Sequence, residues 1–166
     1  MDVWVGVAVA IVLGAGLGVV IARRRARRRP IGTPPHDVAG LLKSYRHGKF
    51  DQVIAGAPDV VAGMGAAVGG QWRWRLELVW GHALFETDRY EEAIPHLARG
   101  LDDAPSPHEA EARFRHCLGY AHQATGRISD ARRTYESLLA DPDLDPAVRD
   151  GVERNLAELP SNGGNR

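Results

Sequence analysis

The second half of this 166-residue chain repeats itself at an interval of 38 residues. Six pairs of positions correspond: Gly81 with Gly119, Asp88 with Gly126, Tyr90 with Ile128, Ala93 with Ala131, Leu97 with Tyr135 and Leu101 with Leu139. In a helical hairpin, small residues let the two helices cross closely, a turn residue ends the first helix, and large apolar residues fill the space between neighbouring hairpins. Turn signals separate segments of helical period, and no strand-like alternation appears. The repeat therefore predicts an all-α domain of helical hairpins.

The segment from Gly81 to Pro95, with the sequence GHALFETDRYEEAIP, resembles a tetratricopeptide repeat (TPR). Units of that family usually have about 34 residues, so the longer interval predicts about four extra residues in the loop around 104–107. The resemblance implies a short α-solenoid over residues 37–159, with a degenerate first unit around Gly48. A C-terminal capping helix is expected from Asp145 to Leu159, where apolar residues follow helical spacing. The sequence leaves open whether the first unit is a true hairpin.

The resemblance also implies a concave peptide-binding groove, lined by the first helix of each unit. The residues that the family register places on this groove are Tyr45, Arg46, Arg75, His82, Phe85, Glu86, Arg113, His116, Tyr120 and Gln123. With Leu78 between Arg75 and His82, the residues of the second unit, like those of the third, are spaced mainly by three and four, which puts each set on one helical stripe. Arginine, histidine and aromatic groups would suit an extended or helical peptide with some carboxylate character. The alternative is that these side chains contact only water or a neighbouring helix.

The N-terminus has a different character. Twenty residues from Val3 to Ala22 carry no charge, and an arginine cluster follows at once. A helix of that length spans about 30 Å, the thickness of the hydrocarbon core of a bilayer. A cleavable signal peptide would place its positive charge before the apolar core instead. Residues 1–29 are therefore expected to be a single-pass anchor in the inner (plasma) membrane, with the N-terminus outside and the helical domain cytoplasmic.

Two parts of the expected anchor have further implications. The arginines that would set its topology and contact lipid headgroups are Arg23, Arg24, Arg25, Arg27, Arg28 and Arg29. Because the cluster adjoins an apolar segment, lipid is the expected partner and nucleic acid is not. Small residues recur at every fourth position, at Gly6, Ala10, Gly14 and Gly18. Such a stripe would allow close packing with another membrane helix, and so a homodimer.

The rest of the sequence argues against a catalytic or metal-binding function. Residues 30–166 contain 15 lysines and arginines and 20 acidic residues, a net charge of −5. Residues 30–36 read as a proline-rich linker, and 160–166 as a disordered tail. The single cysteine, Cys117, excludes an internal disulfide, and no two histidines have the helical i, i+3 or i+4 spacing of a metal site. No catalytic motif is present. We expect no metal, no cofactor and no enzyme activity.

These observations favour a membrane-anchored TPR adaptor or scaffold that holds a partner protein or peptide in its groove at the cytoplasmic face, with no catalytic step. Tethering would raise the local concentration of the groove near the membrane, so that even weak affinity could recruit a partner. The alternative is a structural or assembly subunit whose helices pack permanently within a larger membrane complex. The sequence does not decide between transient and permanent occupation.

Overall fold

The structure, a computed structural model, describes residues 33–64, 66–104 and 109–160. The segment 34–166 forms a compact unit of its own, distinct from 1–33. Within the described residues there are helices only: α2 (His36–Arg46), α3 (Phe50–Gly63), α4 (Ala66–Phe85), α5 (Tyr90–Asp102), α6 (Glu109–Ala124), α7 (Ile128–Leu139) and α8 (Pro146–Glu158). The prediction of an all-α domain is confirmed for this part of the chain.

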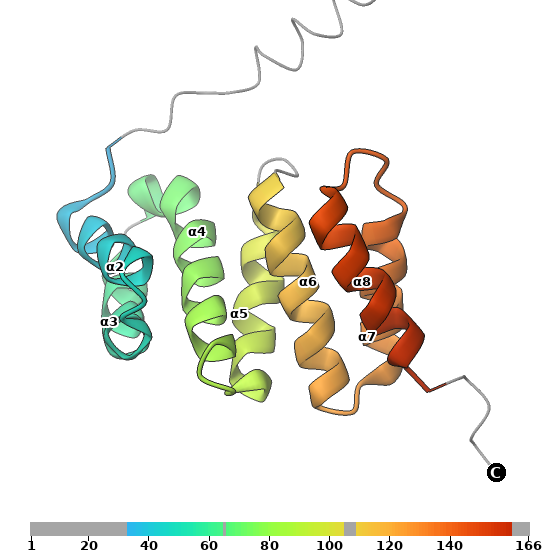
Figure 1. Ribbon diagram of the computed structural model, residues 1–166. Helices are drawn as coiled ribbons and strands as arrows, with labels where there is room; N and C mark the ends of the chain where they lie inside the picture. Colours follow the sequence, from blue (N-terminus) through green and yellow to red (C-terminus); the bar gives the residue numbers. More distant parts are fainter. Residues whose placement is uncertain (1–32, 65, 105–108, 161–166) are drawn as a thin grey trace, which may run out of the picture. The chain divides into compact units, whose positions relative to one another are not determined.

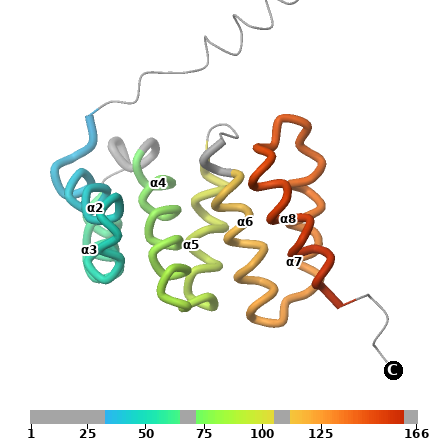
Figure 2. Tube along the Cα trace, viewed as in Figure 1, coloured from blue at the N-terminus to red at the C-terminus, as the bar shows by residue number. Residues whose placement is uncertain are grey.

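The helices pack as consecutive hairpins, α2 with α3, α4 with α5, and α6 with α7, followed by α8 (Figure 1). The first helices of neighbouring hairpins also pack on one another, α2 on α4, α4 on α6 and α6 on α8. The trace of the chain shows the same succession of hairpins (Figure 2). This is the repeat-like helical packing of an α-solenoid, in which each unit contacts mainly its neighbours. Helix α4 has contacts on several sides, and its buried residues accordingly lie around much of its circumference.

Each of the three hairpins has the same turn between its two helices. A residue with positive φ follows the first helix each time: Gly48 at 68°, Asp88 at 59° and Gly126 at 75°. The backbone N–H of the next residue then donates to the carbonyl five positions earlier, from Lys49 to Ser44, from Arg89 to Leu84 and from Arg127 to His122. This left-handed ending satisfies the last carbonyls of a helix and favours Gly, Asn or Asp. The degenerate first unit is therefore a hairpin with the same turn as the other two.

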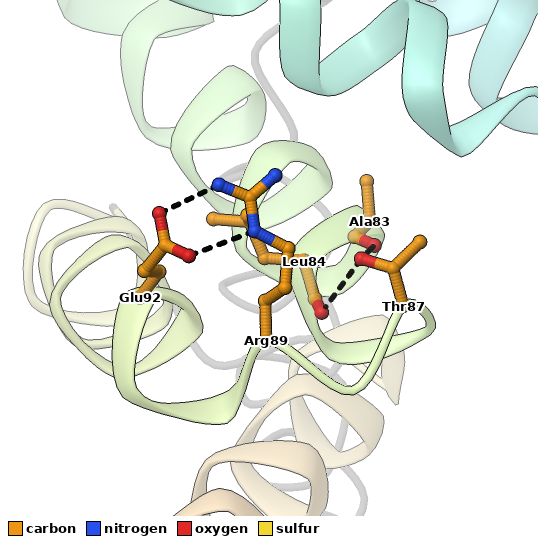
Figure 3. A network of polar contacts seen from close by, with 5 residues as sticks. All are labelled: Ala83, Leu84, Thr87, Arg89 and Glu92. Carbon is orange, nitrogen blue, oxygen red and sulfur yellow. Dashed lines mark hydrogen bonds and ion pairs between the residues drawn. The ribbon is translucent and has the colours of Figure 1, made fainter.

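Side chains reinforce the turn of the second hairpin (Figure 3). The hydroxyl of Thr87 lies 3.0 Å from the carbonyl oxygen of Ala83 and 3.1 Å from that of Leu84. Arg89, just before α5, donates two hydrogen bonds of 2.7 Å to the carboxylate of Glu92. Thr125 repeats the role of Thr87 in the third hairpin, with its hydroxyl 2.8 Å from the carbonyl oxygen of Ala121. The 38-residue repeat thus extends to the polar contacts of the turns.

Glycines mark the points where helices of a hairpin approach most closely. A Cβ atom at Gly81 would lie 2.8 Å from both the backbone nitrogen and Cγ of Leu97. A Cβ atom at Gly119, the matching position in the third hairpin, would collide with the ring of Tyr135. Leu97 and Tyr135 are both fully buried. The predicted correspondence of Gly81 with Gly119 and of Leu97 with Tyr135 is confirmed, because the two pairs form equivalent helix crossings.

The predicted fold class and localisation need correction where they concern a membrane. No helix among residues 33–64, 66–104 and 109–160 is long and apolar enough to cross one. The longest, α4, has 20 residues but contains Arg73, Arg75 and Glu77. Each such charge at the centre of a membrane helix costs about 2.5–3.5 kcal/mol. The segment predicted as an anchor, 1–29, lies outside the described residues. The fold class is therefore corrected to all-α, with no transmembrane helix among the described residues, and the single-pass inner-membrane localisation is withdrawn.

Four other predictions fall wholly or largely on residues that the structure does not describe. The arginine cluster and the small-residue stripe both belong to residues 1–32. The predicted loop extension falls mainly on 105–108, and the predicted tail falls on 161–166 except for Pro160. The capping helix is confirmed as α8, whose N-cap residue Asp145 accepts hydrogen bonds from the backbone nitrogens of Ala147 and Val148.

Candidate functional site

Seven aromatic rings, counting imidazole, form a continuous series of ring contacts along the first helices of the three hairpins. We call this series the aromatic row. Its members are Tyr45 from α2, Phe50 at the start of α3, His82 and Phe85 from α4, Tyr90 at the start of α5, and Phe114 and Tyr120 from α6. The closest ring centroids are 5.4 to 6.1 Å apart along the row. These are the separations at which edge-to-face aromatic pairs attract.

His82 joins the two ends of the row. Its ring contacts Tyr45 at 5.5 Å and Phe85 at 6.0 Å, and it also makes an edge contact with Phe114 at 5.6 Å. Burial lowers the pKa of His82, while the nearby Glu86 carboxylate opposes that shift. Nε2 of His82 lies 3.4 Å from the Glu86 carboxylate, and its Nδ1 is buried with no partner among the described residues. The centre of the row is therefore a neutral imidazole among aromatic rings.

One end of the row is a group of three rings in mutual contact. Phe85, Tyr90 and Tyr120 have centroid separations of 5.4, 5.7 and 5.8 Å. Tyr120 is 39 % exposed, and it is the only large hydrophobic residue in the described part of the chain to be classed as exposed. The hydroxyl of Tyr90 donates a 2.5 Å hydrogen bond to Asp88, which raises the pKa of Tyr90 to about 12. An aromatic surface at this end of the row is thus open to solvent.

The other end of the row is buried more deeply and carries positive charge nearby. Burial raises the pKa of Tyr45 to about 12, and also that of Cys117 on α6 to about 12. Glu86 raises both pKa values further, whereas Arg113 lowers both. Arg113 and Arg46 are exposed, and neither takes part in an ion pair among the described residues. Cys117 is therefore a protonated thiol in the packed interior, unsuited to act as a nucleophile.

Three of the residues predicted to line a groove have other contacts. The guanidinium of Arg75 lies over the rings of Trp74 at 4.4 Å and Trp72 at 5.1 Å. Nε2 of His116 lies 2.9 Å from Nδ2 of Asn155 on α8, and burial lowers the pKa of His116. Gln123 accepts a 3.0 Å hydrogen bond from the hydroxyl of Tyr135. His116 and Gln123 thus join α6 to neighbouring helices, whereas Arg75 stacks on tryptophans of its own helix.

The structure brings together the other predicted residues of α2 and α4 and adds some that sequence reasoning missed. Tyr45, His82, Phe85 and Tyr120 all belong to the aromatic row, with Glu86 beside it. Phe50, Tyr90 and Phe114 were not predicted as part of the surface. Phe50 and Tyr90 share a signal that could have found them, because each lies two positions after the left-handed turn residue and begins the second helix of its hairpin. Phe114 has no comparable signal.

The described residues contain no group of three or more histidine, cysteine or acidic side chains that could hold a metal ion. Two of the histidines have ring neighbours instead: His96 stacks on Trp80 with centroids 3.7 Å apart, and His82 lies in the aromatic row. What the arrangement offers chemically is an apolar, ring-lined surface with charged groups at its edges.

Comparison with models of protein families, with curated proteins and with solved structures finds no match to this chain. The function of the chain is therefore inferred from the residues of the aromatic row and from their geometry.

Proposed function

We propose that the chain is a TPR-type α-solenoid that binds a peptide segment of a partner protein on its aromatic row, without catalysis. The observation that carries this proposal is the continuity of the row across three hairpins, ending at the exposed ring of Tyr120. Tyrosine and tryptophan are enriched among residues that dominate binding energy, because a rigid ring offers much contact area for little loss of conformational freedom.

The scaffold suits this role because the rings are held by regular helices. Phe85 lies at the end of α4 and Tyr120 on α6, and the cores beneath them include the fully buried Ala93 and Leu97. Side chains on packed helices keep their geometry better than side chains on loops, so the surface is largely organised before a ligand arrives. The tilted and edge-on ring contacts leave Tyr120 partly open, where an apolar group of a ligand would complete its burial.

The test is a selection of displayed peptides on the full-length chain, followed by titration of the selected peptides. Tyr120→Ala and Phe85→Ala should each weaken binding about tenfold or more, as for residues at the centre of an interface. Glu136→Ala is the matched control, because Glu136 is an exposed residue of α7, away from the aromatic row. Circular dichroism should show unchanged helicity in all variants. Selected peptides that bind the Tyr120→Ala variant as well as the unmodified chain would refute the proposal.

A further inference from the structure

Two arginines in the turns before α5 and α7 are already paired. Arg89 is held by two hydrogen bonds to Glu92, and Arg127 lies 2.6 Å from Glu91. The second of these ion pairs joins α5 to the turn before α7. Each arginine therefore has a carboxylate of its own, and neither takes part in an ion pair with Glu86 or Asp88, the two carboxylates beside the exposed rings.

Glu86 and Asp88 have only neutral partners in the described part of the chain. Glu86 contacts the imidazole of His82, whose desolvation favours its uncharged form. Asp88 accepts a hydrogen bond from the uncharged hydroxyl of Tyr90. Both carboxylates act electrostatically on Tyr90, together with Tyr120. The exposed end of the row thus combines aromatic faces with two carboxylates, neither of which forms an ion pair with a lysine or arginine among the described residues.

The cationic residues predicted to line the surface are elsewhere. Arg75 lies over Trp72 and Trp74, and Arg113 acts on Tyr45 and Cys117 at the other end of the row. The expectation of a ligand with carboxylate character rested on these arginines. In the structure two carboxylates lie beside the most exposed aromatic surface, and residues 30–166 as a whole have a net charge of −5, which the six arginines and Asp2 of residues 1–29 bring to zero in the full chain.

We infer that the partner segment is basic, and that an arginine or lysine side chain packs over Tyr120 while its charge meets the carboxylates of Glu86 and Asp88. A cation over the face of a tyrosine ring is attracted by the ring quadrupole. A carboxylate beside the ring can in addition accept a charge-assisted hydrogen bond from that cation. This inference rests on the proposed function, since it names the chemistry of the ligand that the aromatic row binds.

The test measures binding of two short labelled peptides to the full-length chain. The peptides share the same apolar residues but carry either two arginines or two glutamates. The arginine peptide should bind about tenfold tighter, because about 1.4 kcal/mol separates a cation on this surface from an anion, and the difference should shrink as salt screens the charges.

Isosteric variants then locate the charge. Glu86→Gln keeps the length of the side chain, and Asp88→Asn keeps both an acceptor for Tyr90 and a residue type that tolerates the left-handed turn. Each should weaken binding of the arginine peptide about fivefold. The matched controls, Glu136→Gln and Asp150→Asn, neutralise exposed carboxylates of α7 and α8 and should leave it unchanged. An equal loss in these control variants, or no loss in Glu86→Gln and Asp88→Asn, would overturn the inference.

The outcomes separate the two proposals. If the glutamate peptide binds tighter and Tyr120→Ala abolishes its binding, the peptide-binding function stands and the basic ligand is refuted. If neither peptide binds, a variant with its six arginines at positions 23–29 replaced by serine should be titrated next. Binding that appears only in that variant would overturn the inference of a separate partner and assign the surface to the chain's own arginine segment. Binding of neither peptide to either protein would overturn the basic-ligand inference, while the peptide-library selection would still decide the proposed function.

Discussion

The carboxylate of Glu77, a side chain of α4 with 1 % exposure, lies 2.7 Å from Nδ1 of His96 on α5. Arg99, one turn further along α5, approaches the other carboxylate oxygen at 3.5 Å. The imidazole of His96 also stacks on Trp80 at a centroid separation of 3.7 Å. A buried carboxylate is costly unless it is paired, so these contacts fix how the two helices of the second hairpin dock.

Removing His96 alone should therefore destabilise the fold more than removing His96 and Glu77 together. His96→Leu leaves Glu77 buried with only the more exposed Arg99 and should lower the free energy of unfolding by about 3 kcal/mol. Adding Glu77→Met to His96→Leu removes the uncompensated charge and should restore most of that loss. Urea denaturation of the single and double variants measures both. A double variant that is less stable than His96→Leu would contradict this account.

Replacing glycine by alanine should have opposite effects on stability at a tight helix crossing and at an open helix position. Gly81→Ala should destabilise the fold by about 1–3 kcal/mol, because its Cβ would meet the backbone nitrogen and Cγ of Leu97 at 2.8 Å. Gly40→Ala, on the exposed face of α2 with nothing within 4 Å of the new Cβ, should stabilise it by about 0.5–1 kcal/mol. Thermal unfolding of both variants checks the signs, and equal shifts would show that the crossing is not tight.

The left-handed turn predicts a graded series at Gly126, whose φ is 75°. Gly126→Ala should cost about 1–2 kcal/mol, because a Cβ is disfavoured at this φ. Gly126→Asn should cost less, since asparagine visits the left-handed region more readily. Open space surrounds the position, so a steric clash would not explain the difference. Urea midpoints compared across the three proteins provide the measurement, and an Asn variant as unstable as the Ala variant would argue against the turn geometry.

His116 predicts a dependence of stability on pH. Burial lowers the pKa of His116 below its usual 6.5, and its Nε2 accepts a hydrogen bond from Asn155, which requires that nitrogen to be unprotonated. Below about pH 6.5 the unfolded chain binds a proton that the folded chain resists, so stability falls as pH falls, until the folded pKa is passed. His116→Gln should reduce the loss of stability between about pH 7.5 and 5.5. Part of the pH dependence should remain in the His116→Gln variant, because the pKa values of His82 and His122 are also lowered. An unchanged pH dependence would refute the role of His116.

Cys117 predicts slow thiol chemistry in the folded chain. With its pKa raised to about 12 by burial, the thiolate fraction at pH 8 is about one in ten thousand. Ellman's reagent should therefore react slowly with the native chain and rapidly in urea. Rapid labelling of the native chain would show that the region between α4 and α6 opens readily.

The sequence predicted where the helices end, but not which side chains meet on the surface. The turn signals around Asp88 and Gly126 correctly placed the ends of α4 and α6, because local backbone geometry and hydrogen bonding determine where a helix stops. The apolar segment from Val3 to Ala22 led instead to a membrane architecture that the described helices do not support, since none of them could span a membrane. Apolar composition predicts how well a segment inserts into hydrocarbon, but does not establish the architecture of the chain.

The surface residues show a similar limit. Helical spacing placed Arg75 on one stripe with His82 and Phe85, and His116 and Gln123 on the matching stripe of the next unit, but spacing alone says nothing about what each side chain contacts. Arg75 has tryptophans within reach in its own helix, His116 meets α8, and Gln123 meets Tyr135. Phe114 was missed because its contact with His82 joins residues on two different helices.

What the sequence by itself determined is the succession of helical hairpins and the identity of their turns and crossings, because periodicity, capping and left-handed glycines act within a few residues of one another. Only the tertiary structure decided that Tyr45, Phe85 and Tyr120 belong to one aromatic row and that Glu86 and Asp88 lie beside its exposed end without a paired cation. These relationships depend on how α2, α4 and α6 pack side by side, and on which arginines are already bound to other carboxylates or rings. Such contacts form between helices, so they cannot be derived from the spacing of residues along a single one.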